Sequence, residues 1–156
     1  MKTLFIAADH AGFELKDALK NLLPEITWND LGTHSKDSVH YPDYAAKLAR
    51  AVVDSGMPLT EACGVLICGS GVGVSIAANR FPQIRAALAW NDEIARLSRE
   101  HNRSNVLCLP ARFLSADEAT KLVTTWLDAK FMEGRHAERV ELLSQLGPQS
   151  KEGLSR

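Results

Sequence analysis

Short apolar runs alternate along this chain with longer segments whose apolar residues recur at helical spacing, and no other feature constrains the fold more strongly. Runs such as 4–8 and 64–68 are apolar throughout, which is typical of strands covered on both faces. Strands that alternate with helices form parallel sheets, because each crossover helix carries the chain back to the same edge of the sheet. The sequence therefore predicts one doubly wound α/β domain with a mostly parallel sheet of about five strands. The predicted strands cover residues 4–8, 26–31, 64–68, 85–89 and 105–109.

The predicted helices lie between and after these strands. The first starts after Gly12 and ends before Pro24. Ser115 caps the fifth helix, since Glu118 three residues later completes a capping box, and this helix runs to about residue 131. The other helices are expected over 44–53, through 76–78, over 92–100 and over 135–146. We assign residues 1–146 to a single domain and residues 147–156 to a polar C-terminal tail.

The composition suits one globular domain and argues against several classes of protein. With 156 residues, of which 46% are hydrophobic, and a formal net charge of -1, the chain can fill one core and has no electrostatic reason to bind nucleic acid or an anionic membrane. No apolar run approaches the roughly 20 residues of a membrane helix, and Asp9 and His10 end the first run too early for a signal peptide. Cys63, Cys68 and Cys108 are odd in number and lack C-x-x-C spacing, so neither a disulfide framework nor a zinc site is indicated. We expect a cytoplasmic protein with reduced thiols and no metal.

A glycine-rich loop, Gly69-Ser70-Gly71-Val72-Gly73, joins the third predicted strand to the next helix. Its backbone N–H groups can turn inward, and such a nest suits a phosphate or a developing oxyanion. Val74 stands where a dinucleotide-binding fingerprint needs its third glycine, and the Gly-Lys-Ser/Thr of a nucleotide P-loop is missing. The alternative is a tight strand-to-helix turn without a ligand.

Cys68 is the last residue of the strand before this loop. A thiol at a helix N-terminus can ionise near neutral pH and act as a base or a nucleophile. The alternative is a buried structural cysteine, the commonest fate of a free cysteine. A thiol redox role is disfavoured, because no second cysteine lies two residues away and Cys63 is poorly placed to bridge.

Other chemistry-bearing residues lie at the ends of predicted strands, where ligands gather in open parallel sheets. Asp9-His10 follows the first strand, and His101-Asn102 precedes the fifth. Either histidine can transfer a proton near neutral pH. Asp9 can orient His10, accept a ligand hydroxyl or cap the next helix. We expect these residues to converge with Cys68 on one site.

Arg135 and Arg139 are four residues apart and share one face of the last predicted helix. Like charges so placed repel unless an anion lies between them, and planar guanidinium groups suit a phosphate. Alternatively, the two arginines pair with Glu138 or Glu141 on a solvated helix. Arg112, after the fifth strand, is a third candidate cation.

Five stretches of the chain have a familiar combination of residues. They are Asp9-His10-Ala11-Gly12, Tyr41-Pro42-Asp43, the run from Cys68 to Asn79, His101-Asn102 with Asn105-Val106, and Gly134-Arg135-His136 with Arg139-Val140. Together they resemble the type B ribose-5-phosphate isomerases, a family that also contains allose-6-phosphate isomerase and the subunits of galactose-6-phosphate isomerase. The match covers residues 1 to about 146, and the glycine-loop stretch is highly specific.

The resemblance implies a Rossmann-like α/β/α sandwich that works without a cofactor. It also implies a homodimer, in some members a tetramer, with active sites at the subunit interface. One branch of the family uses a cysteine before the glycine loop as its base, and the other uses a glutamate a few residues later. Cys68 is present and residues 72–76 contain no acid, so the chain resembles the cysteine branch.

The resemblance also implies the roles of individual residues. The implied catalytic residues are Cys68, Ser70 and His101. The implied substrate-binding residues are Asp9, His10, Tyr41, Gly69, Gly71, Val72, Gly73, Asn102, Arg112, Arg135 and Arg139.

The implied reaction interconverts D-ribose 5-phosphate and D-ribulose 5-phosphate through a cis-enediolate, in the non-oxidative branch of the pentose phosphate pathway. One alternative is isomerisation of a six-carbon sugar phosphate, such as allose 6-phosphate or galactose 6-phosphate. Another is a non-catalytic module that binds a sugar phosphate. Such a module has no use for Cys68, Ser70 and His101 together, so their joint presence favours the enzyme.

Overall fold

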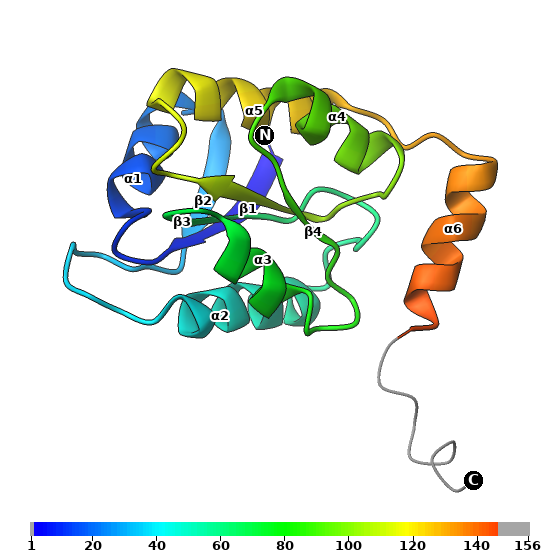
Figure 1. The fold of residues 1–156 in the computed structure, drawn as a ribbon, viewed down its shortest axis with the longest axis horizontal. Helices are drawn as coiled ribbons and strands as arrows, with labels where there is room; N and C mark the ends of the chain where they lie inside the picture. The colour runs from blue at the N-terminus through cyan, green and yellow to red at the C-terminus, as the bar shows by residue number, and fades with distance from the viewer. Residues whose placement is uncertain (1, 147–156) are drawn as a thin grey trace, which may run out of the picture.

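Five strands form a sheet at the centre of the molecule, with helices on both of its faces (Figure 1). The structure is a computed structural model, and it describes residues 2–146. The strands are β1 (Lys2–Ala8), β2 (Ile26–Asp30), β3 (Gly64–Cys68), β4 (Ala86–Leu88) and β5 (Val106–Pro110). Their order is β2-β1-β3-β5-β4, and every neighbouring pair is parallel. The predicted doubly wound α/β/α fold is confirmed, with a sheet that is wholly parallel.

Two helical layers cover the sheet. The helices α1 (Phe13–Leu22), α4 (Asp92–Glu100) and α5 (Ala116–Asp128) pack on one face, and α2 (Tyr41–Asp54) and α3 (Val72–Ala78) pack on the other (Figure 1). Side chains of the central strands alternate between the two cores, as the pleat requires. Ile67 belongs to the core under α1 and α5, whereas Leu66 and Cys68 belong to the core under α2 and α3. No helix within residues 2–146 has both the length and the apolar character needed to cross a membrane.

Two element boundaries differ clearly from the predicted ones. The helix α2 begins at Tyr41 rather than at residue 44, because Pro42 suits the first turn of a helix. The helix α5 ends at Asp128, before the predicted end near residue 131. Its predicted capping box is confirmed, since the Glu118 amide donates to Ser115 Oγ at 3.1 Å and the Ser115 amide donates to Glu118 Oε2 at 2.7 Å.

The last helix, α6 (Arg135–Ser144), stands apart from the two layers at the end of the irregular segment 129–134 (Figure 1). It exposes the large apolar side chains of Leu142 and Leu143, and Leu146 just beyond it is exposed as well. Exposed apolar side chains that lie side by side are a common feature of interaction surfaces. The predicted polar tail, 147–156, lies outside the described residues.

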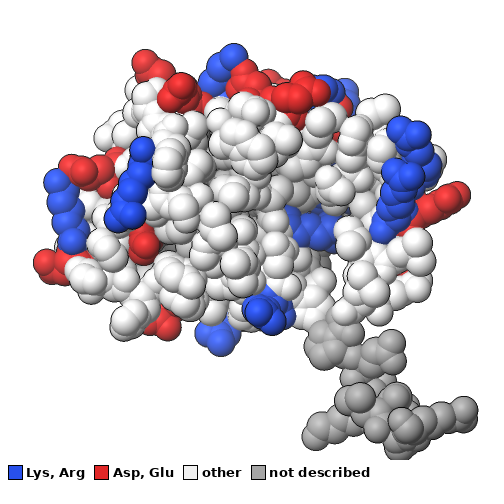
Figure 2. Space-filling view, in the orientation of Figure 1, with Lys and Arg blue, Asp and Glu red and all other residues white. Residues whose placement is uncertain are grey.

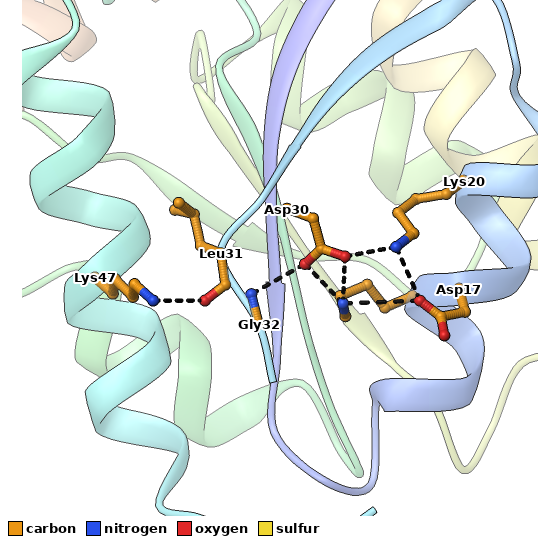
Figure 3. Close-up of polar contacts among 7 residues, drawn as sticks. Asp17, Lys20, Asp30, Leu31, Gly32 and Lys47 are labelled. Atoms are coloured by element: carbon orange, nitrogen blue, oxygen red, sulfur yellow. Dashed lines mark hydrogen bonds and ion pairs between the residues drawn. The ribbon is translucent and has the colours of Figure 1, made fainter. Parts of the chain in front are cut away.

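A charged cluster joins α1 to the end of β2 (Figure 3). The Asp30 carboxylate accepts hydrogen bonds from Lys16 Nζ at 2.6 Å, from Lys20 Nζ at 2.5 Å and from the Gly32 amide at 3.0 Å. The Lys16 side chain is fully buried, and that of Asp30 is 16% exposed. Burial alone raises the pKa of Asp30, but the hydrogen bonds from Lys16, Lys20 and Gly32 outweigh it and lower the pKa to about 2. The cluster therefore stabilises the fold through an ionised carboxylate.

We predict that Asp30→Asn lowers the free energy of unfolding at pH 7 by about 3 kcal/mol, because the buried Lys16 ammonium loses its counter-charge. The pKa of Asp30 is depressed on folding, so its contribution is complete above the unfolded value of 3.8 and is lost as the pH falls through about 2. Urea unfolding of the variant and the wild type from pH 7 to pH 2 measures this difference, which should shrink below pH 4.

Asp17→Asn is the matched control. Asp17 is 43% exposed and lies 3.0 Å from Lys20 Nζ and 3.8 Å from Lys16 Nζ, and such a partly exposed carboxylate contributes less than about 1 kcal/mol. A stability difference between Asp30→Asn and the wild type that stays constant down to pH 2 would show that the Asp30 charge is not responsible.

Candidate active site

Three strands end side by side at one edge of the sheet, which we call the carboxyl edge. The strand β1 ends just before Asp9, β3 ends at Cys68, and β5 ends at Pro110, two residues before Arg112. In the ladder Ala8 pairs with Ile67, and Cys68 pairs with Pro110. The parallel register therefore brings the residues that follow these strands to one place.

The thiol of Cys68 lies against the glycine turn that follows β3. Its Sγ accepts a hydrogen bond from the Gly71 amide at 3.1 Å, and the residue is 5% exposed. Gly71 has a φ of 72°, a left-handed conformation that glycine adopts without strain and that turns the amide back toward the sulfur. The turn therefore fixes the Cys68 sulfur beside a backbone N–H donor at the carboxyl edge.

The other two cysteines have different surroundings. Burial raises the pKa of Cys63 to about 11, and its Sγ donates to the carbonyl groups of Pro58 and Glu61. Burial, together with the neighbouring Cys68, raises the pKa of Cys108 far above its ordinary value. Both thiols are therefore neutral at pH 7 and have little nucleophilic character.

Two side chains lie directly over the glycine turn. A Cβ atom added at Gly69 would lie 3.0 Å from the guanidinium carbon of Arg112, and one added at Gly73 would lie 2.7 Å from the Tyr41 ring. The Arg112 amide donates to the Gly69 carbonyl at 3.0 Å, which fixes the start of this side chain beside the turn. A cation and a phenol thus border the turn that holds the Cys68 sulfur.

Asp9 and His10 join the same cluster from the end of β1. The Asp9 amide donates to the Ile67 carbonyl at 3.2 Å, and its buried carboxylate accepts from the amides of Ala11 at 3.0 Å and Gly12 at 3.1 Å. Asp9 therefore holds the turn before α1 but does not cap the helix itself, whose N-cap is Gly12. His10 Nδ1 accepts from the backbone amide of residue 39 at 3.2 Å, so the neutral ring carries its proton on Nε2.

The carboxyl edge brings together ten of the predicted site residues. They are Asp9, His10, Tyr41, Cys68, Gly69, Ser70, Gly71, Val72, Gly73 and Arg112. Ser70 is exposed on the turn, where its Oγ accepts from the Val72 amide at 3.3 Å. Among the described residues, no group of three His, Cys, Asp or Glu side chains is placed to hold a metal ion.

The remaining predicted site residues, His101, Asn102, Arg135 and Arg139, lie at the opposite edge of the sheet. We call this the amino edge, because the strands begin there. The helix α4 runs antiparallel to the strands, so His101 at its C-terminal end, just before β5, lies at this edge. A strand of five residues spans about 16 Å, and Figure 1 shows α6 on the far side of the molecule from the loop between β3 and α3. Within one chain, these four residues therefore lie away from Cys68, and their convergence with it on one site stays a prediction. In a parallel sheet, a residue that precedes one strand lies at the opposite end from a residue that follows its neighbour.

This second cluster contains two stacked histidines. The ring centroids of His101 and His136 are 4.1 Å apart, and the ring planes are 6° from parallel. His136 is 7% exposed. Burial lowers the pKa of His136, and the positive charges of His101, Arg135 and Arg139 lower it further. His136 was not among the predicted site residues, although it belongs to the stretch Gly134-Arg135-His136, one of those that carry the family resemblance.

Arg135 and Arg139 lie in the first half of α6. Within residues 2–146 neither arginine forms an ion pair, so the alternative in which they pair with Glu138 or Glu141 is not observed. Their charge is therefore available to an anion outside the chain, and a phosphate suits two guanidinium groups on one helix face.

A pocket of about 460 Å³ opens between α6 and the body of the molecule, where Figure 2 shows a hollow. Leu143 and Leu146 line it on the α6 side, and Asn102 lines it on the other. Figure 2 also shows that the face over α3 and β4 is largely free of charged side chains. The exposed residues of α3 include Val72 and Ile76. This face and the projecting helix have the character of an interface.

Residues 4–143 match the Ribose/Galactose Isomerase family. The chain is 40% identical over 148 residues to the ribose-5-phosphate isomerase B of Escherichia coli (strain K12), and the aligned region covers 94% of this chain and 97% of the relative. Among solved structures, it is similar to the ribose 5-phosphate isomerase of Thermotoga maritima, with a TM-score of 0.86 and 43% identity over 93% of this chain and 99% of that one. It is also similar to the ribose-5-phosphate isomerase B of Mycoplasma genitalium with bound ribulose-5-phosphate, with a TM-score of 0.83 and 37% identity over 92% of this chain and 94% of that one.

We predict that iodoacetamide at pH 7.5 modifies Cys68 well before Cys63 or Cys108. The Cys68 sulfur lies at the carboxyl edge beside the Gly71 amide and the residue is 5% exposed, whereas the other two cysteines are fully buried and burial keeps their thiols neutral. Intact mass after brief treatment should show one adduct, and peptide mapping should place it on Cys68.

Cys63→Ser is the matched control for this experiment, because serine keeps a donor for the carbonyl groups that Cys63 contacts. It should be alkylated like the wild type, whereas Cys68→Ser should not. Earlier modification of Cys63 or Cys108 would contradict the prediction that Cys68 is the reactive thiol.

Proposed function

Because the chain belongs to the Ribose/Galactose Isomerase family, we propose that it interconverts D-ribose 5-phosphate and D-ribulose 5-phosphate. The family makes it a sugar-phosphate isomerase, and the choice of ribose is supported by its similarity to the ribose-5-phosphate isomerases of Escherichia coli and Thermotoga maritima. The observation that carries the proposal is the position of the Cys68 sulfur, which receives an amide hydrogen bond beside Arg112 and Tyr41. An enediolate reaction requires such a base next to fixed backbone donors.

In the proposed reaction, the Cys68 thiolate removes the proton from C2 of the open-chain aldose. The electrons of the broken C2–H bond form a C1=C2 double bond, and negative charge moves to O1. Backbone N–H groups of Gly69 to Gly73 stabilise this cis-enediolate. The Ser70 hydroxyl relays a proton from O2 to O1, after which the Cys68 thiol protonates C1 and the carbonyl group forms at C2.

Ring opening and phosphate binding need the second cluster, and we infer that another copy of the chain supplies it. Since the two clusters lie at opposite edges of one sheet, a homodimer can join the carboxyl edge of one protomer to the amino-edge cluster of its partner. The exposed leucines of α6 and the face over α3 and β4, which has few charged side chains, support such an assembly. A tetramer built from two such dimers leaves the site unchanged.

Within this composite site, each cluster has a distinct task. Arg135 and Arg139 of one protomer, together with Arg112 and His10 of the other, bind the phosphate. His101, with Asn102 beside it, protonates the ring oxygen of the furanose as the bond from this oxygen to C1 breaks. The C1 hydroxyl gives its proton to solvent, which leaves the open-chain aldehyde on which Cys68 acts. His101 thus works near the Asp9 of the partner subunit.

A six-carbon sugar phosphate is the second candidate substrate, because the family description names galactose beside ribose. One more carbon requires slightly more room next to the phosphate site. A non-catalytic sugar-phosphate-binding module is disfavoured, since it has no need of an amide-supported thiol at the carboxyl edge. Assays with allose 6-phosphate and galactose 6-phosphate beside ribose 5-phosphate separate these possibilities.

We expect the purified protein to convert ribose 5-phosphate in D₂O to ribulose 5-phosphate that carries solvent deuterium at C1, as followed by ¹H NMR. Cys68→Ala should lower kcat by about 10³-fold and leave KM within about threefold, because it removes a base that acts in the transition state. Cys63→Ser should behave like the wild type. Near-wild-type turnover by Cys68→Ala would remove this thiol from the mechanism, and conversion of six-carbon substrates alone would favour the second candidate.

Subunit mixing tests the composite site. Cys68→Ala and His101→Asn should each be inactive, yet an equal mixture after subunit exchange should recover about a quarter of wild-type activity, because half of the dimers are mixed and each holds one intact site of two. A mixture of Cys68→Ala with Cys68→Ser is the control and should stay inactive. Native mass spectrometry that shows mixed dimers without recovered activity would place both groups within one subunit.

A further inference from the structure

The proposed mechanism uses His101 but gives no role to His136, the buried ring stacked on it. We propose that His136 is a positioning residue that acts through His101: it stays uncharged and offers its ring face to the His101 imidazolium, which stabilises the proton that His101 gives to the sugar. This proposal rests on the proposed function, in which His101 protonates the ring oxygen.

The geometry of the pair favours one proton on His101. The rings are 4.1 Å apart and 6° from parallel, so a protonated His101 lies over the π face of its neighbour. A cation in this position is attracted to the ring electrons. His101 is also the C-cap of α4, where its amide donates to the Leu97 carbonyl at 2.8 Å, and the last carbonyl groups of a helix favour positive charge.

The surroundings of His136 keep it neutral. Burial lowers its pKa, and the positive charges of His101, Arg135 and Arg139 lower it further. The charged groups that act on His136 are His101 at the end of α4 and Arg135 and Arg139 on its own helix, α6. Since a second proton would place two positive charges within one stack, protonation of His101 excludes protonation of His136.

The stack also fastens the first turn of α6 to the end of α4, so a purely mechanical role for His136 must be distinguished from the proposed one. Phenylalanine at position 136 keeps a flat π face and carries no proton. Leucine at the same position keeps an apolar anchor of similar size but has no π face. If His136 only anchors α6, phenylalanine and leucine should replace it equally well. If its ring face stabilises the His101 imidazolium, only phenylalanine should replace it.

Titration of the histidine ring signals by NMR, without any substrate, tests the proposal on the full-length protein. We expect the titration midpoint of His101 to fall by about one pH unit in His136→Leu and to stay close to the wild-type midpoint in His136→Phe. His34→Leu makes the same change at an exposed histidine outside the cluster and should leave the His101 signal unchanged. His136→Met replaces the leucine variant if the latter does not fold.

The pH dependence of kcat/KM gives a second measurement. The alkaline limb, where His101 loses its proton, should move to lower pH in His136→Leu by the same amount as the NMR midpoint, and it should not move in His136→Phe. Equal midpoints in the leucine and phenylalanine variants would overturn the proposal and leave His136 as an anchor of α6. Because the NMR titration needs no turnover, it decides the role of His136 even if ribose 5-phosphate proves not to be the substrate.

Discussion

The parallel pairing of β3 with β1 on one side and β5 on the other is the constraint on which the rest of the structure depends. It aligns three strand ends, so that Asp9, Cys68 and Arg112 leave the sheet at one edge. The same register decides which core receives each side chain. A slip of one residue would turn Cys68 from the core under α2 and α3 to the core under α1 and α5, away from the amide of Gly71.

This edge is reinforced by the segment between β2 and α2. The Asp30 cluster holds the amide of Gly32, and the Thr33 amide donates to the Ala8 carbonyl at 2.8 Å at the end of β1. Farther along, the amide of residue 39 donates to the His10 ring. Hydrogen bonds therefore tie one end of this loop to the last residue of β1 and the other end to His10, which follows that strand. The buried Asp30 cluster, far from the proposed chemistry, thus helps to position His10, which we propose binds the phosphate.

The layered architecture was predictable because it depends on local periodicity. Continuous apolar runs mark strands buried on both faces, and the pair Ser115 and Glu118 marks a helix start wherever it occurs. The tight turn after Cys68 was also predictable from the sequence, because Gly71 adopts a left-handed conformation that glycine favours. The roles of the individual site residues remain predictions that the experiments above can test.

Two aspects of the site were not predictable in the same way. The order of the chain already placed His101 before β5 and Cys68 at the end of β3, but their separation follows only when strand direction is applied to both residues. The stack of His136 on His101 depends on how the segment 129–134 leads α6 back toward α4, with the Met132 amide donating to the Glu100 carbonyl at 2.8 Å. That is tertiary geometry, and no periodic pattern encodes it.

The location of the thiol and the histidine at opposite edges of one sheet has an evolutionary consequence. In the proposed dimer, after a gene duplication, one copy could lose its sulfur and the other its imidazole, and a mixed pair would still contain one complete set of the proposed catalytic groups. Each descendant would be inert alone, and natural selection would then retain both genes as obligate partners. A fold that divides its chemistry in this way can turn one gene into two mutually dependent ones through mutations that each look like simple losses.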